Sequence, residues 1–339
     1  MVAFQQWRTG IKCPRVAMGK FAKSLHEISA NDMNEVGHKA TSLGQLARAG
    51  FNVPAGCCLL RQSYSCLIEH NQLEPKVESI LREMNYHDFG SVESKTSDIR
   101  NLITSARFPP DLESEISRVI STLRGRDQHF LAVRGSWVSE HVTGIHHTSL
   151  TSGMAGPFYC LRGKKPVSQH TKLCWSSYWS PKAALSRYHR KVDHNLEYLA
   201  PIIQRMVDSR VSGVLYTCNF NPGSKNEIRI EAKWGLGDTV VSGRSMNDLF
   251  TLRRPGLALK EKYIVKKTVM AVFDEKGGAG STEKAVDTEM MDTDALNATE
   301  LRELGETGLE IERLFGSPQE IDWAFEDQEL FILGSRKIQ

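Results

Sequence analysis

Cationic side chains that could hold phosphate occur at three separate places in the sequence. Lys39 follows Gly37 where a helical pattern begins, so its ammonium group could reach an anion that also meets the helix N-terminus. Arg134 follows three apolar residues in LAVRGS, and Arg336 lies in the terminal FILGSRKIQ. A planar guanidinium can bind two phosphate oxygens at once. Taken singly, Lys39 could instead be a solvated surface residue, and Arg134 could belong to a structural ion pair.

Acidic side chains on two predicted strands could complete such a site. In QEIDWAFE, Glu320 and Asp322 share one face of a strand, and such a pair can hold a hard cation such as Mg²⁺. Glu231 lies on the polar face of the alternating stretch EIRIEAKWGLG, just before a Gly-x-Gly turn. That stretch could also be an exposed sheet edge without a functional role.

The register of the two C-terminal strands decides whether these groups meet. A two-residue turn between the strands would place Asp322 opposite Leu333. A three-residue loop would place Asp322 opposite Gly334 instead. Glu320 would then face Arg336, with the charged groups on one face and the bulky apolar groups on the other. We therefore predict a three-residue loop.

Periodicity indicates the elements that position these groups. The helices are predicted over residues 37–51, 62–71 and 297–316. The strands are predicted over residues 129–136, 201–218 (two strands joined by a turn) and 227–237, followed by a final strand, turn and strand. Gly135 is expected to end its strand, and Asn297 with Glu300 to form a capping box. Residues 274–292 are predicted to form a mobile excursion.

The segment 141–170 is poor in regular pattern and rich in Gly, Ser, Thr and His. A loop of this length is usually functional or disordered. Its TSGMAG stretch, which includes Gly156, could cradle phosphate with backbone amides or could serve only as a flexible connector. His146 and His147 lie just upstream, and we interpret them as solvated loop histidines.

The composition is typical of a globular protein, with 339 residues, 40% of them hydrophobic and 24% charged. No apolar run reaches the roughly 18 residues that cross a bilayer, and the N-terminus lacks the apolar core of a secretory signal. The net charge of +3 gives no reason to expect nucleic acid. Seven cysteines without a C-x-x-C pair indicate a cytoplasmic protein. We expect an α+β fold with a leader over 1–18 and two lobes over 19–198 and 199–339.

Taken in order, these places resemble the N-terminal nucleotide-binding domain of the pyruvate phosphate dikinase and phosphoenolpyruvate synthase family, which includes rifampin phosphotransferase. The similarity runs from about Lys20 to the end. Five collinear stretches carry it: VGHKATSLGQLARAGFNVPAG, LAVRGSWVSE, QRMVDSRVSGVLYT, NEIRIEAKWGLGDTVVSGR and PQEIDWAFEDQELFILGSRKI. The resemblance implies an ATP-grasp fold, in which two lobes with mixed or antiparallel sheets enclose a nucleotide cleft.

The resemblance also implies roles for the charged residues. Lys39 and Arg134 would grip the phosphates of ATP, and Arg336 would stabilise charge on the transferring group. Glu320 and Asp322 would hold Mg²⁺ or steer the phosphates. Phosphoryl transfer needs little beyond positioning and cationic stabilisation, which lysine, two arginines and a metal can supply.

On the nucleoside side, the resemblance implies that Gln204, Met206 and Val207 line the adenine, with hydrogen bonds from the hinge backbone. Glu231 and Gly156 would contribute to the nucleotide cleft. The sequence also departs from the family pattern. His38 stands where the family has a second glycine, Gly334 stands where it has glutamine, and Cys218-Asn219 replaces an Arg-Asp pair.

The implied function is an Mg²⁺- and ATP-dependent phosphotransferase of the dikinase type, which yields AMP and phosphate. In the family, a histidine on a separate domain carries the phosphoryl group. We find no Thr-x-x-x-Ser-His stretch of that kind and expect the acceptor to be a small molecule or a histidine in another polypeptide. Two alternatives stay open. An ATP-grasp ligase would yield ADP and a new covalent bond, and a non-catalytic module would bind ATP without turnover.

Overall fold

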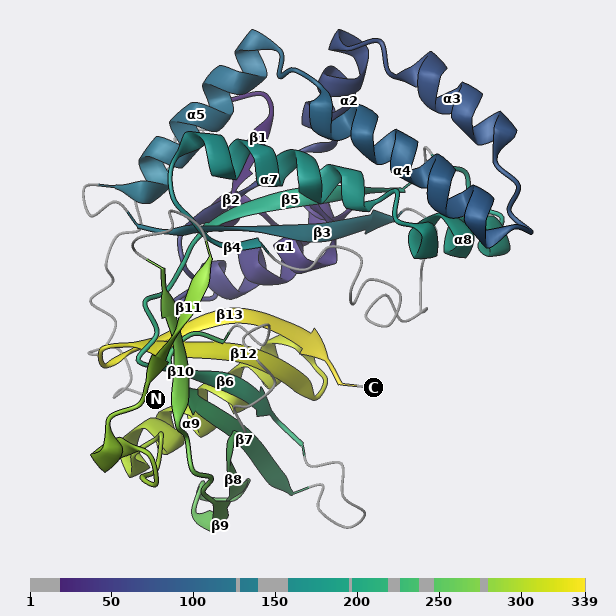
Figure 1. Ribbon diagram of the computed structural model, residues 1–339. Coiled ribbons are helices and arrows are strands. Elements are labelled where there is room, and N and C mark those ends of the chain that lie inside the picture. The colour runs from purple at the N-terminus through teal and green to yellow at the C-terminus, as the bar shows by residue number, and fades with distance from the viewer. Residues whose placement is uncertain are drawn as a thin grey trace.

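The computed structural model of the chain describes residues 19–125, 129–139, 158–194, 197–218, 226–237, 247–274 and 280–338. Two antiparallel sheets, each covered by helices, form two lobes, and a two-stranded hairpin accompanies them (Figure 1). The predicted α+β class with antiparallel sheets is confirmed. Within the ranges given above, no helix is long and apolar enough to cross a membrane.

The first lobe is built on a five-stranded sheet with the strand order β1-β2-β5-β3-β4. Its strands are β1 (Ala22–Ser24), β2 (Gly56–Leu59), β3 (Leu131–Ser139), β4 (Phe158–Leu161) and β5 (Glu197–Arg205). Most of its helices cover one face, and α1 (Met33–Arg48) covers the other (Figure 1). The covering helices are α2 (Arg61–His70), α3 (Glu74–Glu83), α4 (Phe89–Ser105), α5 (Pro110–Arg124), α7 (Lys164–Ser177) and α8 (Pro181–Arg190). Two short 3₁₀ turns, η1 (Leu25–Glu27) and η2 (Ala30–Asp32), precede α1.

The second lobe is built on a six-stranded sheet with the order β13-β12-β6-β7-β8-β9. Its strands are β6 (Val211–Tyr216), β7 (Glu227–Trp234), β8 (Asp248–Arg253), β9 (Leu259–Tyr263), β12 (Gln319–Glu326) and β13 (Glu329–Lys337). Helix α9 (Ala298–Phe315) packs on one face. The hairpin consists of β10 (Val269–Phe273) and β11 (Ser281–Ala285), and the 3₁₀ turn η3 (Thr288–Met290) follows it.

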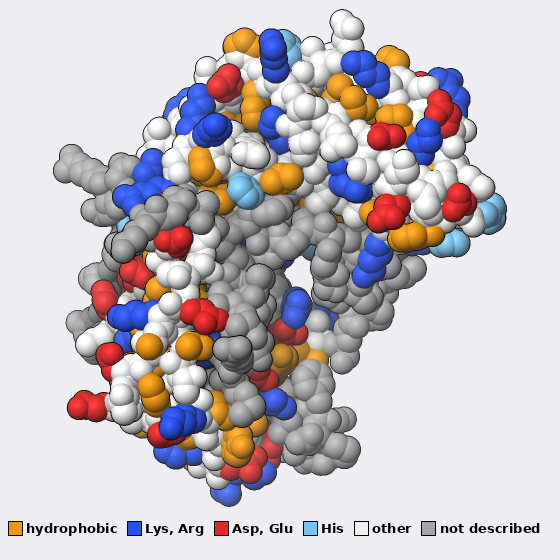
Figure 2. Space-filling view, viewed as in Figure 1, with side chains coloured by type: hydrophobic (Ala, Val, Ile, Leu, Met, Phe, Trp, Pro, Cys, Tyr) orange, Lys and Arg blue, Asp and Glu red, His pale blue; other side chains and the backbone are white. Residues whose placement is uncertain are grey.

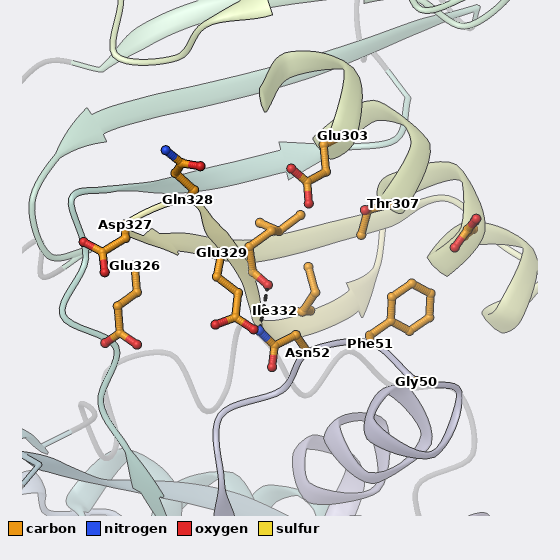
Figure 3. A pocket seen from close by; sticks show the side chains of 12 residues that line it. Gly50, Phe51, Asn52, Glu303, Thr307, Glu326, Asp327, Gln328, Glu329 and Ile332 are labelled. Atoms are coloured by element: carbon orange, nitrogen blue, oxygen red, sulfur yellow. Dashed lines mark hydrogen bonds between the residues drawn. The ribbon is translucent and has the colours of Figure 1, made fainter. Parts of the chain in front are cut away.

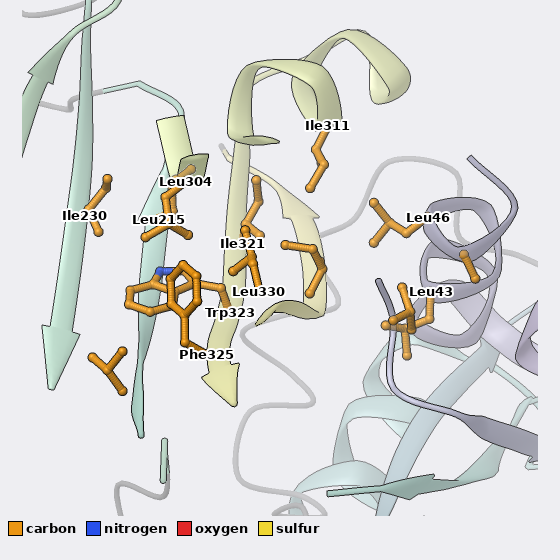
Figure 4. Packing of buried hydrophobic residues seen from close by; sticks show 14 of the residues in the cluster. Leu43, Leu46, Leu215, Ile230, Leu304, Ile311, Ile321, Trp323, Phe325 and Leu330 are labelled. Atoms are coloured by element: carbon orange, nitrogen blue, oxygen red, sulfur yellow. The ribbon is translucent and has the colours of Figure 1, made fainter. Parts of the chain in front are cut away.

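The apolar face of the second sheet forms a core with α9. Residues of β7 are alternately buried and partly exposed, as its sequence predicts, because one face meets the core and the other does not. Trp323 and Phe325 of β12 belong to the same cluster as Leu304 of α9 (Figure 4). Leu43 and Leu46 of α1 extend this cluster, so the core of the second lobe continues to the helix beneath the first sheet. The other face of the sheet is left for polar groups.

Strand β3 continues through Gly135, where the sequence predicted its end. Gly135 pairs with Pro201 of β5, and β3 stays paired with that strand from Leu131 to Ser139. A Cβ atom at Gly135 would lie 2.8 Å from Cδ2 of Leu199, so the glycine leaves room for that side chain. The prediction was wrong because glycine here permits a close approach and does not break the strand.

The segment after β5 carries the chain from one lobe to the other. The sequence predicted two strands joined by a turn over 201–218, but β5 and β6 lie in different sheets. The stretch between Arg205 and Val211 is therefore the crossing between the lobes. The expected boundary at 198/199 falls inside β5, which stays paired in the first sheet through Arg205.

The β10–β11 hairpin links the two lobes (Figure 1). The backbone N–H of Leu236 donates to the carbonyl of Ala271 at 2.8 Å, and the N–H of Gly280 donates to the carbonyl of Cys160 in β4 at 3.1 Å. The sequence predicted a mobile excursion over 274–292. That prediction is wrong for β11, because β11 pairs with β10 along its whole length.

The predicted capping box at the start of α9 is confirmed. The side chain of Asn297 accepts from the N–H of Glu300 at 2.9 Å, and the Glu300 carboxylate accepts from the N–H of Asn297 at 2.9 Å. Asn297→Ala is expected to lower the free energy of unfolding by about 1 kcal/mol, since the N–H of Glu300 loses its side-chain acceptor. Urea denaturation measures this change. Thr299→Ala, at an exposed position in the same turn, is the control and should change stability little; equal losses in both variants would contradict the assignment.

Candidate active site

The terminal hairpin brings its charged residues opposite one another, as the sequence predicted. Asp322 pairs with Gly334, and Glu320 pairs with Arg336. The guanidinium group of Arg336 forms an ion pair with the Glu320 carboxylate. That carboxylate and, after it, Asp322 raise the pKa of Arg336. The predicted pairing of these four residues is confirmed.

The pairing arises from a different connection than the one predicted. Glu326 pairs with Glu329, so the turn has two residues and not three. The register then shifts between Asp322 and Trp323, where Leu333 is the extra residue of a β-bulge. The predicted three-residue loop is wrong, because the bulge supplies the one-residue offset that we assigned to the loop.

Three cationic side chains converge on Asp322 from separate elements. Lys39 comes from α1, Arg134 from β3 and Arg336 from β13, and the charges of both arginines and of Asp322 act on the Lys39 ammonium group. A Cβ atom on Gly334 would lie 3.2 Å from Oδ2 of Asp322 and 3.8 Å from Nη2 of Arg134, so both groups border this glycine. Figure 2 shows a hollow between the lobes with acidic and basic side chains at its margin.

The ammonium group of Lys39 lacks a counter-charge of its own. Protein atoms around it displace water and lower its pKa to about 8, and the nearby charge of Arg134 acts in the same direction. Asp322 opposes this shift only in part. Lys39 is nevertheless exposed to solvent, which screens part of this effect and leaves its side chain accessible to a ligand. Among the described residues, nothing forms a hydrogen bond or an ion pair with this ammonium group. Uncompensated positive charge of this kind is a site for an anion.

A kink at Gly37 places Lys39 at the start of the regular helix. Gly37 has φ 76°, and a Cβ atom there would lie 2.2 Å from the carbonyl oxygen of Trp137, which only glycine tolerates. The hydroxyl of Ser136 accepts from the N–H of Ala40 at 3.1 Å and ties the helix to β3. The first turn after the kink therefore packs against the part of β3 that also carries Arg134.

Arg134 makes contacts with both lobes. Its Nη1 donates to the carbonyl oxygen of Leu333 at 2.7 Å and lies 3.4 Å from Oε1 of Gln204. Its Nε is buried and has no hydrogen-bond partner among the described residues. A ligand cannot reach this buried Nε, whereas Nη2 has no hydrogen-bond partner among the described residues and retains donor capacity for a ligand oxygen.

Glu231 lies on the same face of the second sheet as Asp322. Both residues pair with Val214 of the strand between them, which places them about 10 Å apart. The Glu231 carboxylate accepts from Arg229 at 2.9 Å and from Asn247 at 3.1 Å. It therefore belongs to the polar face that borders the cationic cluster without contacting the three cations directly.

Gln204, Met206 and Val207 follow one another from the end of β5 into the crossing between the lobes. The backbone of Gln204 is paired on both sides, with Gly56 of β2 and Ala132 of β3. Met206 packs beside a cluster from both lobes that contains Phe130, Cys160, Leu236, Ala271 and Phe273. Val207 is buried in a second cluster with Ala324, Phe331 and Leu333. Most of these side chains are buried, and the partly exposed Met206 and Leu333 leave apolar surface that an aromatic ring can contact.

Sequence reasoning missed that Phe331 lies on the sheet face that carries Asp322. A regular hairpin would alternate Phe331 with Arg336 and turn it toward the opposite face. Because of the bulge, Phe331 pairs with Ala324 and lies on the same face as Asp322. No pattern in the sequence predicts the bulge. Gly156, His146 and His147 lie outside the described residues.

The carboxylates fit a magnesium ion that is completed by other oxygen ligands. Glu320 is engaged by Arg336, whereas Asp322 has no hydrogen bond or ion pair among the described residues. No group of three or more metal-binding side chains occurs in that part of the chain. Mg²⁺ commonly binds to one or two carboxylates together with substrate phosphates and water. The two residues therefore suit a metal that arrives with a nucleotide.

A separate pocket of about 590 Å³ lies between α9, the α1–β2 connection and the β12–β13 turn (Figure 3). Its lining includes five acidic residues, Glu303, Glu310, Glu326, Asp327 and Glu329. Lys39, Arg134 and Arg336 do not line it. Concentrated negative charge repels a polyphosphate, so this pocket does not suit the phosphates of a nucleotide.

Comparison with known proteins identifies the family to which the chain is similar. The family model described as pyruvate phosphate dikinase, AMP/ATP-binding domain, matches residues 33–339. The chain is 31% identical to a probable phosphoenolpyruvate synthase of Methanocaldococcus jannaschii, over 94% of this chain and 27% of the relative. It is 29% identical to a probable phosphoenolpyruvate synthase of Pyrococcus horikoshii, over 94% of this chain and 43% of the relative. It is also 29% identical to rifampicin phosphotransferase of Bacillus subtilis, over 95% of this chain and 36% of the relative.

The chain thus spans less than half the length of these curated relatives. The matched segment covers nearly the whole chain and includes every cationic and acidic residue of the cluster described above. The family that the five collinear motifs predicted is confirmed. This chain belongs to the pyruvate phosphate dikinase AMP/ATP-binding domain family.

Proposed function

We propose that this chain is an ATP- and Mg²⁺-dependent phosphotransferase that binds the nucleotide between its two lobes in an ATP-grasp arrangement. The observation that carries this proposal is the convergence of Lys39, Arg134 and Arg336 around Asp322. The three cations come from both lobes, so a bound polyphosphate would connect the lobes. Membership in an AMP/ATP-binding domain family supports the same ligand.

The cations have different surroundings, which supports different roles. Lys39 and Nη2 of Arg134 have no hydrogen-bond partner among the described residues, so both can hold phosphate oxygens in the ground state. Arg336 is oriented by Glu320 and suits the charge that develops on the transferring group. When bound, Mg²⁺ neutralises charge on the phosphates, and Asp322 with Glu320 would hold it.

The apolar clusters at the crossing support a place for the adenine ring. Met206 and Val207 lie where the chain passes from β5 to β6, and Phe331 borders the same region. An aromatic base would cover the partly exposed Met206 and Leu333 there while its phosphates extend toward Lys39 and Arg134. We assign Met206 and Val207 to the base and Glu231 to the polar border of the nucleotide site.

The reaction that we propose is of the dikinase type, in which ATP yields AMP and phosphate. The acceptor is a small molecule or a histidine of another polypeptide. The relatives are named phosphoenolpyruvate synthase and rifampicin phosphotransferase, which supports phosphoryl transfer to different acceptors within one family. Acid–base residues are few in the described site, and phosphoryl transfer relies mainly on positioning and charge stabilisation.

The test is to incubate the protein with ATP and Mg²⁺, with and without a metabolite extract, and to follow nucleotides and phosphorylated products together. AMP and phosphate with a newly phosphorylated mass are expected. ADP with a new carbon–nitrogen bond would indicate a ligase instead. ATP binding without turnover under all conditions would overturn the phosphotransferase proposal in favour of a non-catalytic module.

ATP affinity is expected to fall as the pH rises through about 8. The pKa of Lys39 in the free protein is lowered to about 8, so the charged form that attracts phosphate prevails below that pH and is lost above it. Between about pH 7 and pH 9 the dissociation constant should rise by about tenfold. Calorimetric titration across this range measures the effect. Lys39→Arg stays charged and should bind ATP with little pH dependence, so an unchanged alkaline loss of affinity in that variant would exclude Lys39 as its source.

A further inference from the structure

The buried amide of Gln204 forms a fixed anchor beneath Arg134. The side chain is 3% exposed, and its Nε2 donates to the carbonyl oxygen of Pro54 at 3.0 Å. Its Oε1 accepts from Nη1 of Arg134 at 3.4 Å. The Gln204 backbone is paired with Gly56 and Ala132 on its two sides, and the hydrogen bond to Pro54 holds the amide at the end of the side chain.

A second acceptor for the same nitrogen comes from the other lobe. Nη1 of Arg134 donates to the carbonyl oxygen of Leu333, the extra residue of the bulge, at 2.7 Å. The preceding part of β13 is held by Asn52, whose carbonyl accepts from the N–H of Ile332 at 2.8 Å. The Asn52 side chain donates to the carbonyl of Leu330 at 3.1 Å. Nη1 is therefore held between an acceptor of the first lobe and one of the second.

This anchoring leaves the other end of the guanidinium group open. With Nη1 fixed, the planar group presents Nη2 near Gly334 and Asp322, where the phosphates of the proposed nucleotide would lie. We propose that Gln204 is a positioning residue, which together with the Leu333 carbonyl fixes the Arg134 guanidinium for phosphate binding. This inference rests on the proposed function, and it gives Gln204 a role that acts through Arg134.

An amide is suited to this role because it both donates and accepts. A carboxylate would offer no donor to Pro54 and would neutralise the charge of Arg134. An apolar side chain would leave the Pro54 carbonyl without its donor and Nη1 with one acceptor fewer, and a buried group that loses its partner is costly. Glutamine thus orients the cation while leaving its charge available to a ligand.

A double-mutant cycle tests whether Gln204 acts through Arg134. Gln204→Met keeps the size of the side chain and removes both hydrogen bonds, and Gln204→Asn shortens the amide and serves as a second variant if the first does not fold. Each should weaken ATP binding by about three- to tenfold in the otherwise natural chain. In an Arg134→Ala background the same changes should have almost no further effect, since the residue that they position is gone.

Gln319 provides a matched control. It is also a buried glutamine, and both atoms of its side-chain amide form hydrogen bonds. Nε2 donates to the carbonyl of Ser317 at 3.0 Å, and Oε1 accepts from Ser335 at 2.7 Å. Gln319→Met removes these two hydrogen bonds and a third, from Nε2 to the Ser317 hydroxyl at 3.0 Å, without touching Arg134. Its effect on ATP binding should be small and should add to that of Arg134→Ala. If Gln204→Met lowers ATP affinity by the same factor in the Arg134→Ala background as in the natural chain, the positioning role is overturned.

A measurement on the ligand-free protein separates this inference from the proposed function. The groups that act on Lys39 are Arg134, Asp322, Arg336 and Cys174. Moving Arg134 away raises the pKa of Lys39, so trace acetylation of Lys39 near pH 7.5, quantified by mass spectrometry, should slow by about threefold in Gln204→Met. Gln319→Met should leave it unchanged. An unchanged rate in Gln204→Met would refute the positioning role, whereas failure of the natural chain to bind ATP would refute only the nucleotide site.

Discussion

Lys39→Met is expected to lower ATP turnover by about 10²- to 10³-fold and, at the same time, to stabilise the ligand-free protein. Lys39 supplies positive charge beside Arg134 and Arg336, where a preorganised cation stabilises charge on a phosphate. Arg134 and Arg336 remain in the variant but cannot replace the lost group at its position. Steady-state assays of AMP formation, with ATP affinity measured separately, would quantify the loss.

The gain in stability follows from the sign of the pKa shift. Folding lowers the pKa of Lys39, so the folded state disfavours its charged form. This cost is fully present below about pH 8 and is relieved as the pH rises from there toward the ordinary lysine value. Since solvent reaches Lys39 and screens it, the gain should be modest, about 1–2 °C in the midpoint of thermal unfolding at neutral pH.

Lys76→Met is the matched control for this prediction. Lys76 lies on the exposed surface of α3, away from the cationic cluster, so its replacement should change neither turnover nor stability measurably. A Lys39→Met protein that retains turnover would show that the cluster is not the phosphate site. A variant that loses both turnover and stability would indicate a structural role for Lys39 instead.

Arg336→Met is expected to lower the rate of phosphoryl transfer by about 10³-fold with a much smaller effect on ATP affinity. An arginine that stabilises charge on a transferring phosphoryl group contributes mainly in the transition state. The ion pair with Glu320 holds Arg336 in place before the ligand arrives, which favours such a role. Single-turnover assays at saturating ATP would isolate the transfer step from binding.

Arg302→Met controls for loss of an exposed arginine that pairs with a glutamate. Arg302 donates to Glu306 on the surface of α9 at 3.1 Å, and its removal should leave the reaction unchanged. If Arg336→Met raises the dissociation constant of ATP and leaves the transfer rate intact, Arg336 would be assigned to ground-state binding. That outcome would contradict the division of roles among the three cations.

Local patterns were sufficient to predict the elements that have one solvent-facing side. The alternation of β7 and the capping box of α9 are both encoded within a few residues, and both were confirmed. The charged rows of the terminal hairpin were likewise predicted, since grouping charge on one face restricts the register. In each case the deciding forces act between near neighbours in the sequence.

The errors arose where distant parts of the chain decide the local structure. Gly135 stays in β3 because Leu199 of the neighbouring strand requires the space. The bulge at Leu333 is visible only once both edges of β13 are known, one against β12 and the other against Asn52. The separation of β5 and β6 into different sheets also depends on partners elsewhere in the chain. No short window of sequence contains this information.

In the candidate site, too, some features could be predicted from local sequence and others depend on distant parts of the chain. Motifs identified the residue types, and the structure brings Lys39, Arg134, Asp322 and Arg336 together from both lobes. The support beneath them could not be predicted, because the contact between Gln204 and Arg134 joins two strands that are about 70 positions apart. The side chains that could do chemistry were visible in the sequence, whereas those that orient them were not.

Calorimetric titration of ATP with Mg²⁺ into the natural chain and into Lys39→Met tests the central claim most directly, with adenosine as a parallel ligand. We expect ATP to bind the natural chain far more tightly than adenosine does, because the cationic cluster holds the phosphates. In Lys39→Met the affinity for ATP should fall by about tenfold or more, while that for adenosine should stay the same. Equal affinities of the natural chain for ATP and adenosine, or an unchanged ATP affinity in Lys39→Met, would contradict the proposal that these cations form a polyphosphate site.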